Sequence, residues 1–189
     1  MLSFFKANKY NTGTACSFWL NSKDGSFWCS LLKQASWDSN KNRGSFAANR
    51  DTDKHARVKF NATEVCGFIE VINSEIQLKD AGVNGYHSSQ KQVVKFSFSP
   101  ITSKDGRKGF ALSVTKEEKE DSTNQVQFKI GFSKAEARSL LIYLDEMVRK
   151  SFKTFGEDNQ EDSEAAPTHK VKKEAAPQQQ EEESENFDF

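Results

Sequence analysis

The sequence predicts an α+β fold in which antiparallel β-sheets are backed by two helices. Several short segments alternate apolar and polar side chains, which is typical of strands that bury one face. Two longer segments repeat apolar residues at steps of three and four, which is the pattern of a helix with one buried face. Because the strands come in groups and each group precedes one helix, the order favours the α+β class.

Both predicted helices begin with the same capping signal. Ser133 and Glu136 have the spacing of a capping box, and so do Asn61 and Glu64. The apolar positions that follow are Val65, Phe68, Ile69, Ile72 and Ile76 in the first helix and Ala137, Leu140, Leu141, Leu144 and Val148 in the second.

Four strands are expected before the first helix and three before the second. The expected segments are strands 2–7, 15–21, 26–34 and 55–60, helix 62–77, strands 91–99, 107–115 and 124–132, and helix 134–153. The stretches 35–54 and 78–89 are predicted to be loops. Loops of this length in a compact domain often carry function.

A repeated turn suggests an internal duplication. Ser22-Lys23-Asp24-Gly25 and Ser103-Lys104-Asp105-Gly106 each separate two strand-like segments, and Asp-Gly between such segments indicates a hairpin. The turns stand in the same order relative to strands and capped helix, so we expect one domain, 1–155, built from repeats 1–77 and 86–155. The alternative is that an α+β chain reuses hairpins and capped helices, which the unequal spacers favour.

The sequence shows no membrane, metal or cofactor signal. It has no apolar segment long enough to cross a membrane and no signal peptide, so we expect a soluble, cytoplasmic protein. Cys16, Cys29 and Cys66 are odd in number and lack metal-ligand spacing, which favours buried reduced thiols over a disulfide or a zinc site. We expect no cofactor.

The formal net charge of zero hides a strong asymmetry. From Gly156 onward there are 11 acidic residues and three lysines, a net charge of −8. Residues 1–155 therefore hold 24 basic and 16 acidic residues, a net charge of +8. A basic domain of this size commonly has an anionic partner, and nucleic acid is the first candidate.

The acidic segment 156–189 is predicted to be a disordered tail with a docking tip. Its Glu, Gln, Ser, Ala and Pro residues cannot bury enough apolar surface to order it. Phe187, Asp188 and Phe189 place two rings and a free carboxylate at its end, which suits a short peptide that docks into a basic-rimmed apolar pocket. The alternative is a solubilising tail with incidental phenylalanines.

Strand alternation separates the expected side chains into two faces. The buried face contains Cys16, Phe18, Leu20, Phe27, Cys29, Leu31, Val58, Phe60, Val94, Phe96, Phe98, Phe110, Leu112, Val114, Val126, Phe128 and Ile130. The other face is polar and basic, and it carries Trp19 and Trp28.

An exposed sheet face with two tryptophans among basic residues suits single-stranded nucleic acid. Bases stack on the rings, and lysine and arginine follow the phosphates. The alternative without a binding role is that these tryptophans pack under a loop or in an oligomer interface, and that the lysines keep the face soluble. The candidate binding residues are Trp19, Trp28, Arg57, Lys59, Lys95 and Lys129 on the face, with Trp37, Lys41, Arg43 and Arg50 from the 35–54 loop.

Catalytic signals are weak. His55, His87 and His169 are the three histidines, and none stands in a metal or triad spacing. The Ser-Lys-Asp-Gly turns are explained by hairpins, and no glycine-rich phosphate loop is present. We expect a protein that is not an enzyme.

The order of several strands followed by a capped helix occurs twice in residues 1–155. This order resembles the Whirly and transcriptional positive cofactor 4 fold. The resemblance implies binding of single-stranded DNA on curved sheets. The tail is similar to that of bacterial and phage single-stranded DNA-binding proteins, which recruit replication and repair partners, although it lacks their Pro-Phe ending. The matching residues are Glu181, Glu182, Glu183, Glu185, Asp188 and Phe189.

We therefore expect a single-stranded DNA-binding protein of a bacterial or phage-infected cell. It would coat displaced strands during replication, recombination or repair, as a homo-oligomer or a cooperative assembly, and recruit replication or recombination proteins through its tail. The alternatives are an OB-fold binder, an RNA-binding or annealing module, and an inhibitory protein that binds another protein's acidic surface.

Overall fold

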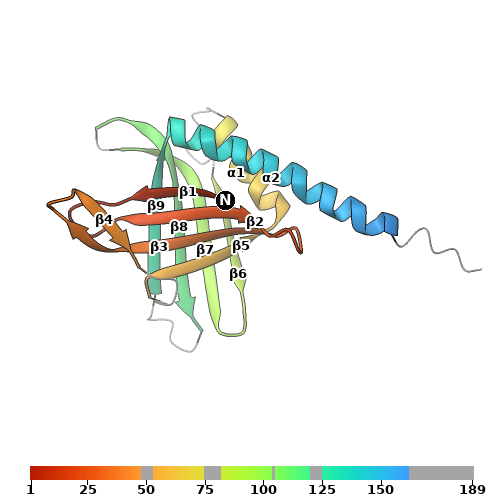
Figure 1. Cartoon of the computed structure of the whole chain (residues 1–189), viewed down its shortest axis with the longest axis horizontal. Coiled ribbons are helices and arrows are strands. Elements are labelled where there is room, and N and C mark those ends of the chain that lie inside the picture. Colours follow the sequence, from red (N-terminus) through yellow and green to blue (C-terminus); the bar gives the residue numbers. More distant parts are fainter. Residues whose placement is uncertain (48–52, 75–81, 104, 120–124, 162–189) are drawn as a thin grey trace, which may run out of the picture.

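The computed structural model describes residues 1–47, 53–74, 82–103, 105–119 and 125–161, and only the backbone of residues 154–161. Its described strands pair as two separate antiparallel sheets (Figure 1). The α+β prediction is therefore confirmed. The alternative of a single OB-fold barrel is wrong, because the strands do not close into one.

The first sheet comes from the N-terminal part of the chain. Its strands are β1 (Leu2–Lys6), β2 (Thr14–Leu20), β3 (Phe27–Asp38), β4 (Arg43–Phe46) and β5 (His55–Phe60). The order is β1-β2-β3-β5, and β4 pairs with the C-terminal part of β3 beyond the end of β5.

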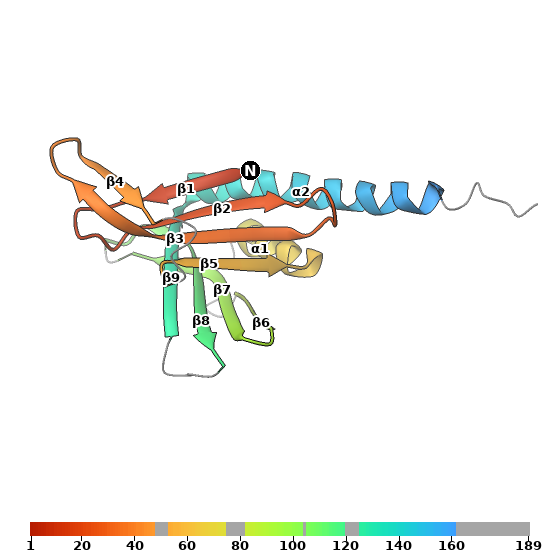
Figure 2. The ribbon, with the colours of Figure 1, turned by 60° about the horizontal axis from the view of Figure 1, so that its bottom comes forward.

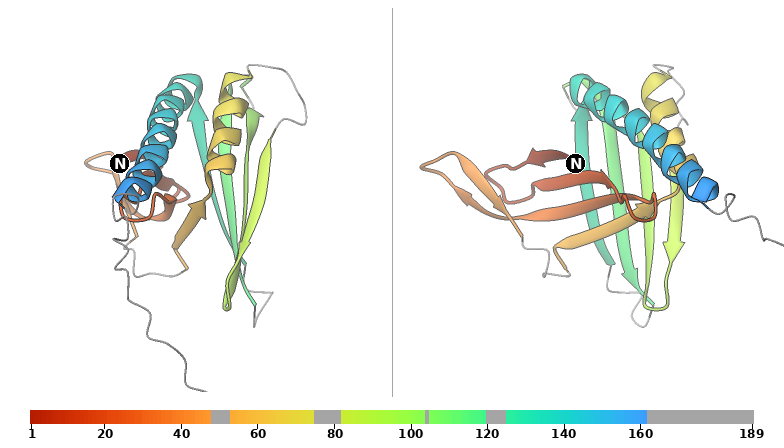
Figure 3. Two further views of the ribbon diagram at one scale, coloured as in Figure 1. Left: turned by 90° about the vertical axis from the view of Figure 1, so that its right-hand side faces the viewer. Right: turned by 45° about the vertical axis from the view of Figure 1, so that its right-hand side comes forward.

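The second sheet and the helices complete the fold. The sheet has the order β6 (Val83–Ser88), β7 (Gln92–Thr102), β8 (Lys108–Glu118) and β9 (Gln125–Ser133), and the helices are α1 (Ala62–Asn73) and α2 (Lys134–Glu161). The strands of one sheet run across those of the other (Figures 1 and 2). The first sheet and both helices lie on the same side of the second sheet (Figure 3).

An aromatic core joins these layers. Phe4 meets Phe132 across the two sheets with ring centroids 5.0 Å apart, and Phe60 meets Phe96 at 4.9 Å. Phe68 of α1 packs edge-on against Phe60 at 5.0 Å. Most residues predicted for the buried face are buried, and Leu20, Phe110 and Val126 are partly buried at its margin. The inner faces of the sheets therefore meet each other.

Two strands lie where loops were predicted. β4 and β6 are short and contain Gly44 and Gly85, which the sequence pattern assigns to turns. Gly85 is required for a close approach, because a Cβ atom there would lie 2.4 Å from the Phe96 ring. Both strands form because a long neighbour, β3 or β7, offers its edge, and a local pattern does not show such pairing.

The helix ends also differ from the prediction. α1 ends at Asn73, where the Ser74 N–H donates to the Glu70 carbonyl and its hydroxyl to the Val71 carbonyl. α2 continues to Glu161, so the predicted domain boundary falls within this helix. The rest of the predicted tail, with its tip, lies outside the described residues.

Each half of the chain consists of antiparallel strands that form one sheet, followed by a capped helix. This arrangement is the one that the duplication hypothesis expects, and the hypothesis itself stays a prediction. Neither described helix is long and apolar enough to cross a membrane. Cys16 and Cys29 are buried as predicted, but Cys66 is exposed, because its position on α1 lies beside the buried stripe that begins at Val65.

Both predicted capping boxes are present. In α1, the Glu64 N–H donates to Asn61 Oδ1, and the Asn61 N–H donates to Glu64 Oε2, each at 2.8 Å. In α2, the Ser133 N–H donates to Glu136 Oε2 at 2.8 Å. Lys6 of β1 forms an ion pair with the same carboxylate, so Glu136 ties the edge of the first sheet to the start of α2.

We expect Glu136→Gln to lower the free energy of unfolding at pH 7 by about 0.2–1 kcal/mol, because the amide oxygen can still accept from Ser133 while the ion pair with Lys6 is lost. Partial burial raises the pKa of Glu136, but hydrogen bonds from Lys6 and Ser133 lower it by more. A depressed folded pKa stabilises the protein above the unfolded pKa, and this contribution is lost as the pH falls through the folded value.

Urea unfolding of both proteins at pH 7 and below about pH 4 tests this expectation, since an unperturbed glutamate has a pKa of about 4.3. The difference should shrink at the lower pH. Glu70→Gln, on the exposed side of α1, is the control and should leave stability unchanged. A variant as stable as the wild type at pH 7 would contradict the role given to Glu136.

Candidate nucleic-acid interface

The outer face of the first sheet carries a row of two tryptophans and a lysine. Trp19 on β2 lies opposite Trp28 on β3, and Trp28 lies opposite Lys59 on β5. The next row along the strands consists of Ser17, Ser30 and Arg57. The face that alternation predicted for these residues is therefore present.

The two indole rings lie nearly parallel, with centroids 6.3 Å apart and planes 12° apart. The Arg57 guanidinium carbon lies 5.7 Å from the centroid of Trp19, and the Lys59 ammonium lies 5.8 Å from that of Trp28. Cations over indole faces are attracted by the ring quadrupole. We name Trp19, Trp28, Arg57 and Lys59 the tryptophan platform.

The β2–β3 turn holds one side of the platform. The Trp28 Nε1–H donates to the Ser26 hydroxyl at 2.7 Å, and that hydroxyl donates to Asp24 Oδ1 at 2.6 Å. Asp24 Oδ2 lies 3.3 Å from the Lys59 ammonium. Hydrogen bonds from the hydroxyl and the N–H of Ser26, with the Lys59 contact, lower the pKa of Asp24. The turn predicted from Asp-Gly thus orients an indole and an ammonium.

The same face continues beyond the platform toward the N-terminal strand. Ser30 Oγ lies 2.9 Å from His55 Nε2, and Ser3 Oγ lies 2.8 Å from Ser17 Oγ. Phe5 is 66% exposed in the following row. Sequence reasoning missed Phe5, because two consecutive phenylalanines in β1 leave the parity of the strand ambiguous.

The other predicted residues of the first half lie on the β3–β4 hairpin, which extends past the sheet (Figure 2). Trp37 pairs with Gly44 there, and Lys41 and Arg43 are exposed. The structure does not place these residues on the platform row. Arg50 lies outside the described residues.

Gln34 fixes the base of this hairpin. Its side chain is 5% exposed, and its Oε1 accepts the Asn8 and Gly13 N–H groups at 2.8 and 3.2 Å. Its Nε2 donates to the Asn8 and Ser36 carbonyls at 2.8 and 3.0 Å. The sequence pattern gives no signal for this role, because a glutamine in an alternating segment indicates an exposed position.

Lys95 and Lys129 belong to a different surface, and this corrects the single basic face of the sequence interpretation. They lie on the outer faces of β7 and β9, and Lys95 is paired with Glu117 at 2.9 Å. Because the two sheets meet through their inner faces, their outer faces point away from each other. Alternation shows which side of a strand is polar but not which sheet the strand joins.

The described residues contain no group of three or more His, Cys, Asp and Glu side chains arranged to hold a metal ion. The platform and the row beside it offer rings, hydroxyls and cations to a ligand. These groups suit a planar, anionic polymer.

No family model matches the chain, and no curated protein sequence matches it. Its structure is similar to solved structures that cover nearly the whole chain. WHY1 from Arabidopsis thaliana has a TM-score of 0.55 at 11% identity, over 90% of this chain and 96% of that protein.

The fold is that of the Whirly proteins. WHY3 from Arabidopsis thaliana has a TM-score of 0.56 at 11% identity, over 87% of this chain and 95% of its own. The plant transcriptional regulator PBF-2 has a TM-score of 0.55 at 13% identity, over 87% of this chain and 88% of its own. The predicted resemblance to the Whirly fold is confirmed for the fold, and identities this low transfer no residue role.

Proposed function

We propose that this protein binds single-stranded DNA through the tryptophan platform. It coats displaced strands in the cytoplasm during replication, recombination or repair, without strong sequence preference. The observation that carries the proposal is the pair of parallel indole rings flanked by Arg57 and Lys59 on an open sheet face.

The chemistry of the platform suits unpaired bases. An aromatic side chain stacks on any base and contributes roughly 1–3 kcal/mol per base. Arg57 and Lys59 beside the rings can contact the phosphates, and each such contact releases condensed counterions. The bases of a duplex are already stacked on each other, so the rings favour a single strand over a duplex.

Two further observations support the proposal. The chain has the Whirly fold, and the resemblance to that family implies single-stranded DNA binding. The body carries a net charge of +8, which attracts a polyanion. RNA also presents planar bases and phosphates, so oligo(U) is the competitor that separates an RNA-binding module from a DNA-binding one.

Assembly of several copies on a strand is part of the proposal. Ile142 and Phe152 on α2 are 59% and 64% exposed, and apolar side chains of this size favour contact with another protein surface.

Replacing either platform tryptophan with alanine should weaken binding to oligo(dT). We expect each of Trp19→Ala and Trp28→Ala to cost roughly 1–3 kcal/mol of binding free energy, because a stacking surface is lost. Titrations followed by fluorescence anisotropy of a labelled oligo(dT) measure this, and circular dichroism checks the fold. If both variants bind as well as the parent, the platform is not the site.

Salt titrations give a matched test of the charges. Arg57→Gln and Lys59→Gln should each reduce the slope of log affinity against log salt by about 0.7, the value per phosphate contact for a single strand. Lys95→Gln and Lys129→Gln remove the same charge from the opposite face and should leave the slope unchanged. Equal reductions of the salt slope in all four variants would indicate that DNA is attracted by the overall charge and not by the platform.

Asp24 should weaken DNA binding, because its carboxylate is paired with the Lys59 ammonium, which a phosphate would otherwise contact. Asp24→Asn keeps an oxygen for the Ser26 hydroxyl but removes the charge. An exposed ion pair contributes about 0.2–1 kcal/mol, so affinity for oligo(dT) should rise by up to about fivefold.

Asp105→Asn is the matched control for Asp24. Asp105 stands in the same turn sequence in the second half, where it pairs with Arg107 instead of with the platform. The control removes the same charge and should leave affinity unchanged. Tighter binding by both variants would mean that net charge alone is responsible, and weaker binding by Asp24→Asn would mean that the carboxylate positions Lys59.

We also propose that the acidic tail recruits replication or recombination proteins through Phe187, Asp188 and Phe189. The support is its composition and its similarity to the tails of bacterial and phage single-stranded DNA-binding proteins. Residues 162–189 hold eight acidic residues and three lysines, a net charge of −5, and such a segment tethered to a body of net charge +5 would compete with DNA for the basic surface.

Deletion of residues 162–189 should tighten oligo(dT) binding, most at low salt where screening is least. It should also abolish capture of a replication partner, such as a polymerase or primase subunit from the same cell. Anisotropy across a salt series and pull-down with the purified partner measure the two effects. Equal affinity at all salt concentrations would contradict the competition but not the docking role.

A further inference from the structure

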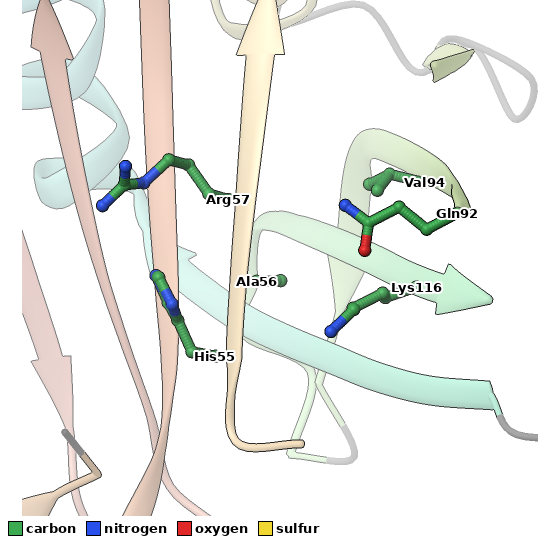
Figure 4. A pocket seen from close by; sticks show the side chains of 6 residues that line it. All are labelled: His55, Ala56, Arg57, Gln92, Val94 and Lys116. Carbon is green, nitrogen blue, oxygen red and sulfur yellow. The ribbon is translucent and has the colours of Figure 1, made fainter. Parts of the chain in front are cut away.

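A cleft lies where the edge of the first sheet meets the second sheet (Figure 4). Its volume is about 150 Å³. In Figure 4 the Gln92 and Lys116 side chains approach β5 from one side, while Arg57 and His55 extend on the other. The residues that line it are His55, Ala56, Arg57, Gln92, Val94 and Lys116.

The cleft adjoins an open strand edge. Within the described residues, β5 pairs with β3 alone, through the register that matches His55 to Leu32. The Lys33 N–H donates to the Lys54 carbonyl at 2.8 Å, so residue 54 directs its backbone toward β3. Backbone direction alternates along an antiparallel strand, so Arg57 directs its N–H and carbonyl toward the open edge. The cleft thus has a backbone donor in its wall.

The lining has the chemistry of an anion site. Lys116 extends its ammonium toward β5 from one side, whereas the Arg57 guanidinium and the His55 imidazole lie on the other side of that strand, and none of the six lining residues is acidic. Gln92 adds an amide that can donate. Carboxylate and phosphate oxygens accept such donors, and charge-assisted hydrogen bonds of this kind are the stronger ones.

Arg57 connects the cleft to the tryptophan platform. Its guanidinium lies over Trp19 on the outer face, while its backbone lines the cleft at the sheet edge. A chain that leaves the platform across β5 therefore reaches the cleft next. Lys116 stands on the inner face of β8, opposite Val94, where the second sheet extends beyond the edge of the first (Figures 2 and 4).

We infer that this cleft binds one phosphate group of the DNA strand whose bases stack on the platform, so that the strand crosses the open edge of β5. The inference rests on the proposed function. Sites for whole drug-sized ligands occupy roughly 300–1,000 Å³, and the cleft is about half the lower value, which suits a phosphate group better than a base with its sugar.

Lys116→Gln tests the cleft without touching the platform. In oligo(dT) titrations across a salt series, this variant should lose about two- to fivefold in affinity, and its salt slope should fall by about 0.7. The quenching of tryptophan fluorescence at saturation should stay as in the wild type. Lys129→Gln, which removes a lysine from the opposite face, is the control and should match the wild type.

Oligonucleotides with one uncharged backbone linkage identify the phosphate group that the cleft binds. A series of short oligo(dT) molecules, each with a single methylphosphonate at a different position, should show a position that weakens wild-type binding in addition to the positions contacted by Arg57 and Lys59. That position should have no effect on Lys116→Gln, because the contact is already lost. Effects that are the same in both proteins at every position would overturn the cleft.

A probe without bases separates the cleft from the proposed function. Inorganic pyrophosphate should shift the backbone amide NMR resonance of Arg57, whose N–H faces the cleft, and Lys116→Gln should weaken the response. Wild-type affinity of Lys116→Gln for oligo(dT), with no response of the Arg57 amide to pyrophosphate, would overturn the cleft. The tryptophan variants decide the proposed function independently, because they leave the pyrophosphate response intact.

Discussion

The inner faces of the two sheets bury one shared aromatic core, and the positions of the other surfaces depend on that contact. Phe4 against Phe132 and Phe60 against Phe96 hold the sheets face to face with their strands crossed. Two outer faces then point in opposite directions, and the second sheet extends beyond the edge strand of the first. The platform, the opposite lysines and the cleft at β5 all follow from this one packing arrangement.

Local patterns predicted much of this fold, because alternation and helical steps report which side chains are buried. They identified both capping boxes, seven of the described strands, and the outward direction of Trp19 and Trp28. They could not show that Lys95 belongs to the opposite surface, since the side of a strand is a local property and the packing of sheets is not. The cleft was missed for the same reason, because only tertiary structure brings Lys116 and Arg57 to the lining of one cleft.

Half-buried indoles on a sheet face need support, because an apolar ring gains little from water. Trp19 and Trp28 lie nearly parallel to each other, and each has a cation near its ring. The Trp28 N–H is satisfied by Ser26. The rings are thus held in place before a ligand arrives, which lowers the conformational entropy that binding must remove. Under the proposed function, the bases would meet rings that are already oriented.

The two Ser-Lys-Asp-Gly turns show how one local sequence acquires different roles. Asp105 pairs with Arg107 two residues along, accepts the Ser103 hydroxyl, and stays within its own hairpin; these contacts lower its pKa. Asp24 accepts from Ser26 and reaches across the sheet to Lys59, which β5 brings beside the turn. The difference lies in the side chains that the neighbouring strand places beside the turn, which for Asp24 include Lys59 of β5. A hairpin signal therefore predicts the turn, and only the sheet around it decides whether its carboxylate belongs to a site.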